Sequence, residues 1–470
     1  MLKRAIWDRL VSWKNRPHHP LILSGLRQIG KTYIAREFGE KNYKSVIYLD
    51  LRKDTRFYSA FDGNFDVNEM VMSITAADPD AHFIPDQTLL ILDEIQDCPN
   101  ARSSLKYWDL DGRYDVIATG SFLGVKGFRA PYERGIPVGY EEKFVMHPLS
   151  FAEFLDNVGM SQSVIDYVKE SLKNGTAVSK TVHESIRSLY YQYIIVGGMP
   201  EAVNTYFATH DLNAVRAVQK RILDSIRDDF GRYKTDSGET KINETLKLRA
   251  EACLDSVPAQ LSREYKKFKY SEVDVKGHST EKADGLQYIA DVGLVLLSHN
   301  LREISAPLEA QEINKEFKVF YADTGLLISQ LDDGTAAHVL NGDLSAYKGA
   351  IAENTVACAF EDIGIPLYYY HAPSGSPELD FVYSDNGIPT IVECKSSRTS
   401  ATSMKHVISN PKKYGRHPAV KYADTNVGGG EGFKTYPLYA LGFLENQEDK
   451  PFIVPEMDLS SLEDSIPKTT

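Results

Sequence analysis

The stretch Gly25-Leu26-Arg27-Gln28-Ile29-Gly30-Lys31-Thr32 decides the fold of this chain. It fits the pattern GxxxxGK[ST] at every required position. The apolar run Leu21-Ile22-Leu23 precedes it, and a helix-like segment from Tyr33 to Phe38 follows it. Glycines let the backbone turn its N–H groups towards phosphate oxygens, and the start of the next helix adds partial positive charge. The stretch therefore predicts a phosphate-binding loop between a buried strand and a helix.

Four residues of this loop have an expected role in binding the nucleotide. Gly25 and Gly30 allow the backbone to curl around the phosphates, and Lys31 reaches the β- and γ-phosphates. Thr32 is expected to place its hydroxyl on Mg²⁺. The ligand and the cofactor implied are thus ATP and Mg²⁺.

A second stretch, Leu89-Leu90-Ile91-Leu92-Asp93-Glu94, completes the constellation. It is an apolar strand that ends in two carboxylates. Asp93 is expected to hold the magnesium ion through water, and Glu94 to orient or deprotonate the attacking water. The alternative is that Asp93 and Glu94 belong to a solvated loop. The presence of both motifs in this order favours nucleotide hydrolysis over that alternative.

A third strand, Tyr114 to Ala118, ends in Thr119-Gly120-Ser121. Thr119 is expected either to touch the γ-phosphate or the attacking water, or to cap the strand end. Arg129 and Arg134 follow in a loop, where each is a candidate arginine finger or a solvated surface arginine.

The fold class follows from the alternation of short apolar runs with helical patterns. The runs Leu21–Leu23, Val46–Leu49, Leu89–Leu92 and Val116–Ala118 have apolar residues on both faces, which is typical of buried parallel strands. Residues 150–245 are expected to be mainly helical, 250–335 a mixture, and 345 onward a helix followed by strands. We therefore expect an α/β protein of several domains.

Bulk composition narrows the class. A chain of 470 residues is too long for one ordinary core, so two to four domains are expected. No apolar stretch of about 18 residues exists, and the N-terminus lacks the apolar core of a secretory signal. The four cysteines are scattered, which fits a reducing cytoplasm rather than a zinc site or disulfide framework. The net charge of −12 argues against a protein coated in nucleic acid, but leaves a local basic groove open.

The motifs together resemble a known family. GLRQIGKTYIAREF, LLILDEIQ and TGS followed by HPLSFAEF resemble the AAA-type ATPases that carry a DUF4143 C-terminal region, and later runs such as YIIVGGMPEAV, VFYADTGLL and KGAIAENTVACAF agree. The resemblance covers nearly the whole chain. It implies a P-loop core, a winged-helix-like middle and a C-terminal module similar to PD-(D/E)xK endonucleases. Many relatives carry a Gly-Arg pair before PLSF where this chain has Glu133-Arg134-Gly135, so Arg134 is not assigned as a finger.

The middle region contains a locally basic segment. Residues 262–276 hold five basic and three acidic side chains, and a helix from Gly285 to Val292 with a strand from Leu294 to Leu297 follows. This order is consistent with a winged helix that contacts DNA. An interdomain packing module with a solvated charged face is the alternative.

The C-terminal region predicts a β-hairpin with two carboxylates on one face. Asn386-Gly387 between two alternating runs is a strong two-residue turn signal. In that register Asp380 faces Glu393 directly, and Lys395 shares their face. Two opposed carboxylates repel each other, and a divalent cation would relieve the repulsion. Lys395 is then a candidate catalytic residue that activates water or steadies phosphate charge.

By resemblance to the family, Glu353 in the helical run KGAIAEN is the first acidic residue of this site. Glu353, Asp380 and Glu393 are therefore the expected ligands of a second Mg²⁺ or a Mn²⁺. A surface hairpin with a Glu393–Lys395 pair is the alternative.

The expected domains are 1–155 (ATPase), 156–340 (helical and winged-helix-like) and 341–445 (endonuclease-like), with a tail at 446–470. The expected function is Mg²⁺-dependent ATP hydrolysis coupled to a nuclease-like module that binds DNA or RNA. The alternative is a regulatory ATPase switch that acts on a protein partner, with a catalytically silent nuclease-like fold. A cytoplasmic location without membrane attachment is expected, and a homo-oligomer is left open.

Overall fold

The computed structural model describes residues 2–120, 139–234, 240–344, 346–395 and 401–444. Arg129, Arg134 and the expected tail at 446–470 lie outside the described residues.

The N-terminal region is a five-stranded sheet in the order β2-β3-β4-β1-β5, in which every pair is parallel. All positions of β1 and β3 are buried, because helices cover both faces. The expected α/β fold with a parallel sheet is confirmed. The elements are α1 (Ile6–Lys14), β1 (Leu21–Gly25), α2 (Lys31–Asn42), β2 (Ser45–Asp50), η1 (Thr55–Phe61), α3 (Val67–Ala77), β3 (Thr88–Asp93), η2 (Ile95–Asp97), α4 (Pro99–Asp111), β4 (Asp115–Thr119) and β5 (Glu142–Met146).

The two faces of this sheet belong to different cores. Side chains of one face, such as Leu23 and Ile91, pack with α1 and α2. Side chains of the other face, such as Ile22 and Leu92, pack with α3 and α4. The alternation of side chains along each strand produces this division.

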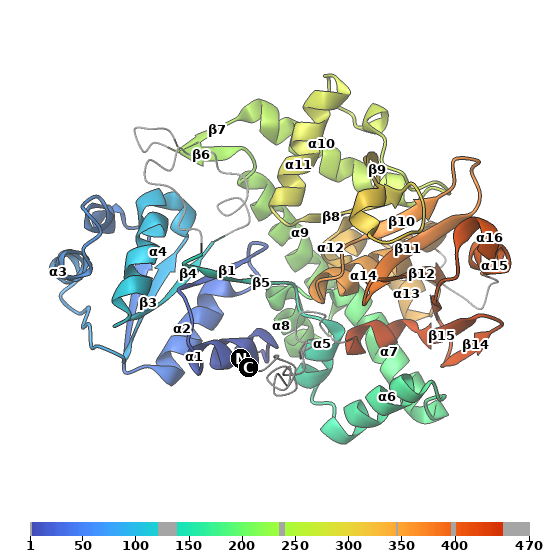
Figure 1. The fold of residues 1–470 in the computed structure, drawn as a ribbon, viewed down its shortest axis with the longest axis horizontal. Helices are drawn as coiled ribbons and strands as arrows, with labels where there is room; N and C mark the ends of the chain where they lie inside the picture. The colour runs from blue at the N-terminus through green and yellow to red at the C-terminus, as the bar shows by residue number, and fades with distance from the viewer. Residues whose placement is uncertain (1, 121–138, 235–239, 345, 396–400, 445–470) are drawn as a thin grey trace, which may run out of the picture.

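A helical region follows the parallel sheet. Figure 1 shows α8 and α9 between the N-terminal sheet and the larger C-terminal sheet. The elements are α5 (Phe151–Val158), α6 (Gln162–Asn174), α7 (Lys180–Val196), α8 (Pro200–Thr209), α9 (Leu212–Asp228), β6 (Arg232–Lys234), β7 (Thr240–Ile242), α10 (Glu244–Leu261), η4 (Tyr270–Glu272) and α11 (Ser279–Asp291).

The C-terminal half is built on an eight-stranded mixed sheet in the order β14-β15-β13-β12-β11-β10-β8-β9. Its elements are β8 (Val295–Leu301), η5 (Leu308–Gln311), β9 (Glu312–Tyr321), α12 (Thr324–Ser329), α13 (Thr335–Leu340), η6 (Ala346–Gly349), α14 (Ala350–Asp362), β10 (Tyr368–His371), β11 (Glu378–Asp385), β12 (Ile388–Lys395), α15 (Thr402–Ser409), α16 (Pro411–Tyr414), β13 (Ala419–Ala423), β14 (Gly428–Gly430), β15 (Phe433–Pro437) and η7 (Leu438–Phe443).

This sheet contains strands from both sides of the boundary expected near residue 340. A division at that point would separate β8 and β9 from the strands with which they share a sheet. One apolar core also continues from Leu23 in β1 through Ile194 in α7 to Phe320 in β9 and Tyr439 in η7. The division into three domains therefore stays a prediction, and the shared sheet argues against its second boundary.

The middle region also differs in detail from the winged-helix expectation. The helix expected from Gly285 begins earlier, at Ser279, and the strands after it are members of the large sheet instead of a separate wing. The basic segment 262–276 contains only the short turn η4 within it. Four of its five basic side chains pair with acidic side chains: Arg263 with Glu272, Lys266 with Glu353, Lys267 with Glu316 and Lys269 with Glu272. These ion pairs leave little unpaired positive charge for a nucleic acid.

The C-terminal hairpin has the predicted register. Asp385 pairs with Ile388, Ser384 with Pro389 and Phe381 with Val392. Asn386 (φ 50°) and Gly387 (φ 80°) both occupy the left-handed region, as a two-residue hairpin turn of the primed type requires.

Among the described residues, no helix is long and apolar enough to cross a bilayer.

The turn should depend on Gly387. Replacing it with alanine places a Cβ at φ 80°, so Gly387→Ala should lower the free energy of unfolding by about 1–2 kcal/mol. Gly428→Ala is the control, because an added Cβ there meets open space at an ordinary φ. Urea unfolding of both variants measures the difference, and equal stability would contradict the turn assignment.

Candidate phosphate-binding site and C-terminal carboxylate cluster

The loop Gly25–Thr32 joins β1 to α2 and has the backbone shape that the sequence predicts. Gly25 has φ 141°, and a Cβ at this position would lie 2.2 Å from the carbonyl oxygen of Met146, so only glycine fits. Gly30 has φ 91° and stands directly before α2. The Lys31 side chain is folded back on the loop, where Nζ donates to the carbonyl oxygens of Gly25 (3.0 Å) and Leu26 (2.9 Å). Burial lowers the pKa of Lys31 to about 8. A phosphate oxygen would give this buried ammonium group the anionic partner that backbone carbonyls do not.

Asp93 lies at the carboxyl end of β3 and connects this loop to two neighbouring strands. Its carboxylate is buried and accepts hydrogen bonds from the hydroxyls of Thr32 (2.9 Å), Tyr48 (2.7 Å) and Thr119. The side chains of the expected magnesium ligands, Thr32 and Asp93, thus lie in contact. Their hydroxyl and carboxylate oxygens are the donor types that Mg²⁺ prefers, and the residues fit the ion.

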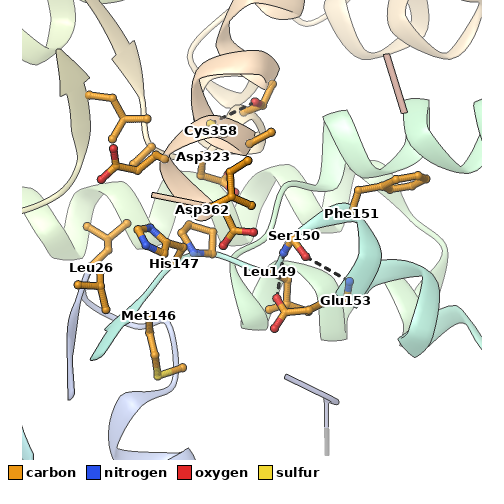
Figure 2. Close-up of a pocket in the computed structure, with 18 of the residues that line it drawn as sticks. Leu26, Met146, His147, Leu149, Ser150, Phe151, Glu153, Asp323, Cys358 and Asp362 are labelled. Atoms are coloured by element: carbon orange, nitrogen blue, oxygen red, sulfur yellow. Dashed lines mark hydrogen bonds between the residues drawn. The ribbon is translucent and has the colours of Figure 1, made fainter. Parts of the chain in front are cut away.

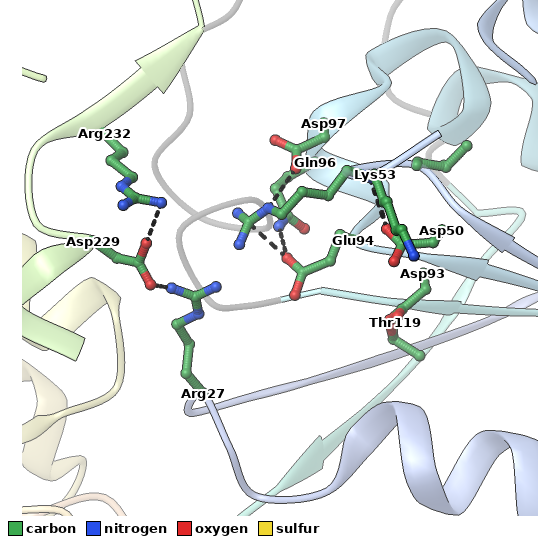
Figure 3. Close-up of polar contacts among 12 residues, drawn as sticks. Arg27, Asp50, Lys53, Asp93, Glu94, Gln96, Asp97, Thr119, Asp229 and Arg232 are labelled. Atoms are coloured by element: carbon green, nitrogen blue, oxygen red, sulfur yellow. Dashed lines mark hydrogen bonds and ion pairs between the residues drawn. The ribbon is translucent and has the colours of Figure 1, made fainter. Parts of the chain in front are cut away.

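Thr119 is positioned by β4, which lies between β1 and β3 in the sheet. Its hydroxyl donates to Asp93, as Figure 3 shows. The residue therefore belongs to the site, although its contact in this structure is to the carboxylate, and the contact to phosphate stays a prediction. Tyr48 was not singled out from the sequence, because a tyrosine within the strand Ser45–Asp50 reads as an ordinary strand residue.

Glu94 follows Asp93 in an unusual conformation. Its φ of 54° lies in the left-handed region, which non-glycine residues adopt mainly where the surrounding structure enforces it. The carboxylate lies 3.6 Å from the guanidinium of Arg52 and accepts a hydrogen bond from the Gln96 amide. Arg52 also pairs with Asp97 at 2.8 Å. The candidate base is thus held beside the loop, and Arg52, which follows β2 at the same edge of the sheet, is a site residue that sequence reasoning missed.

A separate cavity of about 600 Å³ lies behind the phosphate-binding loop. Figure 2 shows that Leu26, His147 and Asp362, from three distant parts of the chain, line it. Burial lowers the pKa of His147 to about 4, and burial together with the charge of Glu153 raises the pKa of Asp362 to about 7. Neither Lys31 nor Asp93 lines this cavity, so it is distinct from the expected phosphate site.

The C-terminal hairpin brings Asp380, Glu393 and Lys395 together as predicted. Lys395 Nζ lies 2.8 Å from Glu393 and 3.9 Å from Asp380. Backbone N–H groups hold both carboxylates, because Cys394 donates to Asp380 (2.8 Å) and Met404 donates to Glu393 (3.0 Å). Burial opposes the charge of Lys395, but the two carboxylates raise its pKa above its ordinary value. A lysine that stays protonated can neutralise charge but cannot act as a base.

Glu353 points into the same region from α14, but lysines already neutralise it. Lys266 pairs with one carboxylate oxygen, and Lys318 lies 3.6 Å from the other. Lys318 also pairs with Glu378 at 2.8 Å. Lys266, Lys318 and Glu353 are all buried.

The charges of this cluster bear on the expected second metal site. Within the part of the chain that the structure describes, no three or more His, Cys, Asp or Glu side chains are grouped to hold a metal ion. The expectation that Glu353, Asp380 and Glu393 share a cation stays a prediction, and the ion pairs of these carboxylates argue against it. The physical reason is that Lys266, Lys318 and Lys395 supply the positive charge that the acidic side chains would otherwise require.

Comparison with known families agrees with the N- and C-terminal assignments. Residues 17–155 match a family described as an AAA domain, and residues 348–441 match a domain of unknown function (DUF4143). Residues 187–336 match a further domain of unknown function (DUF8612). The chain thus contains an AAA domain and a DUF4143 domain, as the resemblance seen in the sequence implies. The similarity of the DUF4143 region to PD-(D/E)xK endonucleases stays a prediction. The chain has no match among curated proteins.

Solved structures that resemble the chain include a Walker-type ATPase of Pyrococcus abyssi (14% identity, 70% of this chain and 96% of that chain, TM-score 0.38). Others are Cdc6p of Pyrobaculum aerophilum (13% identity, 72% and 93%, TM-score 0.24) and the RuvB Holliday junction branch migration motor of Thermotoga maritima (12% identity, 63% and 89%, TM-score 0.28).

The cavity carboxyl should make stability depend on pH. The pKa of Asp362 is raised in the folded state, so its stabilising contribution is present at low pH and is lost as the pH rises through about 7. Asp362→Asn cannot ionise and should melt at a higher temperature than the wild-type chain at pH 8. This advantage should shrink as the pH falls towards the ordinary pKa of about 4.

Thermal melting from pH 4 to pH 8 measures this effect. Asp284→Asn, at an exposed position, is the control and should change the melting temperature little at any pH. An Asp362→Asn variant whose melting temperature differs from that of the wild-type chain by the same amount across the range would contradict the assignment.

Proposed function

We propose that this protein, which contains an AAA domain, binds ATP with Mg²⁺ at Gly25–Thr32 and hydrolyses it. The observation that carries the proposal is the meeting of Thr32, Asp93 and Thr119 beside the buried Lys31. A loop with the GxxxxGK[ST] pattern, a strand-end carboxylate and a following glutamate are the parts that phosphoryl transfer to water requires.

Each residue has a role in this proposal. Lys31 leaves the loop carbonyls and neutralises the β- and γ-phosphates, and the loop N–H groups hold them in place. Thr32 and Asp93 would hold Mg²⁺, which supplies charge neutralisation on the phosphates when it is bound. Glu94 orients the attacking water and accepts its proton. Arg52 lies 3.6 Å from the Glu94 carboxylate, and this contact must break for the glutamate to reach that water.

For the C-terminal half, the lysine contacts favour the regulatory alternative over metal-dependent cleavage. Lys266 and Lys318 lie against Glu353, and Lys395 pairs with Glu393, so lysines face carboxylates that a metal would need. We therefore propose that the DUF4143 region works as a binding or regulatory module without a resident cation. Binding of DNA or RNA, a protein partner, self-association and a cytoplasmic location remain predictions.

The ATPase proposal is tested at Lys31 and Glu94. Lys31→Ala should strongly weaken ATP binding, because it removes the buried positive charge that faces the phosphates. Glu94→Gln should keep ATP binding but slow hydrolysis by roughly 10²–10⁴-fold, because it removes the base. Equilibrium binding of a fluorescent ATP analogue and steady-state phosphate release measure the two effects. Lys220→Ala, on the exposed side of α9, is the control. Turnover at the wild-type rate in Glu94→Gln would show that another group is the base.

The silent-module proposal is tested by incubating the purified chain with single- and double-stranded DNA and RNA in Mg²⁺ or Mn²⁺. No cleavage above background is expected. Asp380→Ala should leave ATP hydrolysis unchanged, because Asp380 lies in β11 of the C-terminal sheet, whereas Lys31 begins α2 beside the N-terminal sheet. Metal-dependent cleavage that Asp380→Ala abolishes would overturn the proposal and support the hypothesis that the C-terminal module is a nuclease.

A further inference from the structure

A carboxylate from the helical region lies at the phosphate-binding loop. Asp229 follows α9 directly and forms ion pairs with Arg27 of the loop and with Arg232, whose Nη1 lies 2.8 Å from Oδ1. Figure 3 shows Asp229 between these two arginines. The adjacent loop residue makes a second link, since the Gln28 amide donates to the Ser225 hydroxyl at 2.9 Å. The loop therefore contacts the end of α9 through two consecutive residues.

The surroundings of Asp229 indicate that the arginines are what stabilises its charge. A carboxylate at the C-terminal end of a helix faces the negative end of the helix dipole. The backbone here is fixed by Tyr288, whose hydroxyl donates to the carbonyl oxygen of Asp229 (3.3 Å) and accepts from the N–H of Gly231 (2.9 Å). Asp229 is thus held in an unfavourable field, with Arg27 and Arg232 as compensating cations.

Arg27 in turn requires an anion. Its side chain is 22% exposed, and burial together with the nearby charges of Arg52 and Arg232 lowers its pKa. A guanidinium group pairs with carboxylate and with phosphate through the same forked geometry. The carboxylate of Asp229 therefore gives Arg27 and Arg232 an anionic hydrogen-bond acceptor, which a phosphate group could also provide.

We propose that Asp229 is an internal counter-anion, which pairs with Arg27 and Arg232 and competes with the triphosphate of ATP for them. The inference rests on the proposed binding of ATP at Gly25–Thr32. Binding of the triphosphate draws the two arginines away from Asp229, and the end of α9 then loses its ion pairs with the loop. Since α9 packs against α7 and α12, nucleotide occupancy is communicated towards the C-terminal half through this helix.

The test compares two single-charge variants on the same helix end. Asp229→Asn removes the counter-anion, so it should bind the fluorescent ATP analogue about three- to tenfold more tightly than the wild-type chain. The gain should be smaller for the corresponding ADP analogue, which carries less charge. Asp228→Asn removes the same net charge at the neighbouring exposed position and should leave both affinities unchanged. Equal tightening by the two variants, or no tightening by Asp229→Asn, would overturn the inference.

Arg27→Gln provides a second variant of opposite sign. It should weaken ATP binding more than ADP binding if the triphosphate takes over this arginine, and an affinity equal to that of the wild-type chain would overturn the inference. Lys31→Ala separates the two proposals. Suppose that the wild-type chain binds ATP, that Lys31→Ala does not, and that Asp229→Asn binds ATP with wild-type affinity. The counter-anion proposal is then wrong, and the proposed ATP binding stands. If the wild-type chain binds no ATP, the proposed function itself fails.

Discussion

The buried carboxylate of Asp93 is the interaction on which the N-terminal site depends. Three hydroxyls from three elements converge on it: Thr32 from α2, Tyr48 from β2 and Thr119 from β4. A buried carboxylate is costly unless it is hydrogen-bonded or paired with a cation, so these contacts stabilise the packing of α2, β2, β3 and β4 at the carboxyl edge of the sheet. The start of α2, Lys31 and Glu94 lie close to this carboxylate. The proposed hydrolysis uses these same groups.

Charge compensation also explains the difference between the two candidate sites. At the N-terminal site, the hydrogen bonds that the described residues make to Asp93 come from neutral hydroxyls, which do not neutralise its negative charge. At the C-terminal site, lysines from the 262–276 segment, β9 and β12 already supply the positive charge. Both clusters contain carboxylates at strand ends or in strands, and the C-terminal cluster also contains Glu353 from α14. The local cations decide which of them fits a metal.

Local patterns in the sequence were sufficient for the phosphate loop, the four apolar strands and the hairpin register. Each depends on residues close in sequence, such as the two positive-φ positions Asn386 and Gly387 that set the pairing of β11 with β12. Contacts between distant segments were not predictable in this way. Lys266 and Glu353 are 87 positions apart, and nothing near either residue indicates the pair. The pairing of β8 with β10 was not predictable for the same reason, because more than one helix lies between the two strands in the sequence. Arg52 and Asp229 likewise enter the nucleotide site only through the fold.

The central claim is that the loop at Gly25–Thr32 and the carboxylate of Asp93 together bind ATP and magnesium. Isothermal titration calorimetry of the wild-type chain with ATP, in Mg²⁺ and again in excess EDTA, tests this most directly. The account predicts one ATP bound per chain in Mg²⁺ and a marked loss of affinity in EDTA. Absence of ATP binding in Mg²⁺ would contradict it.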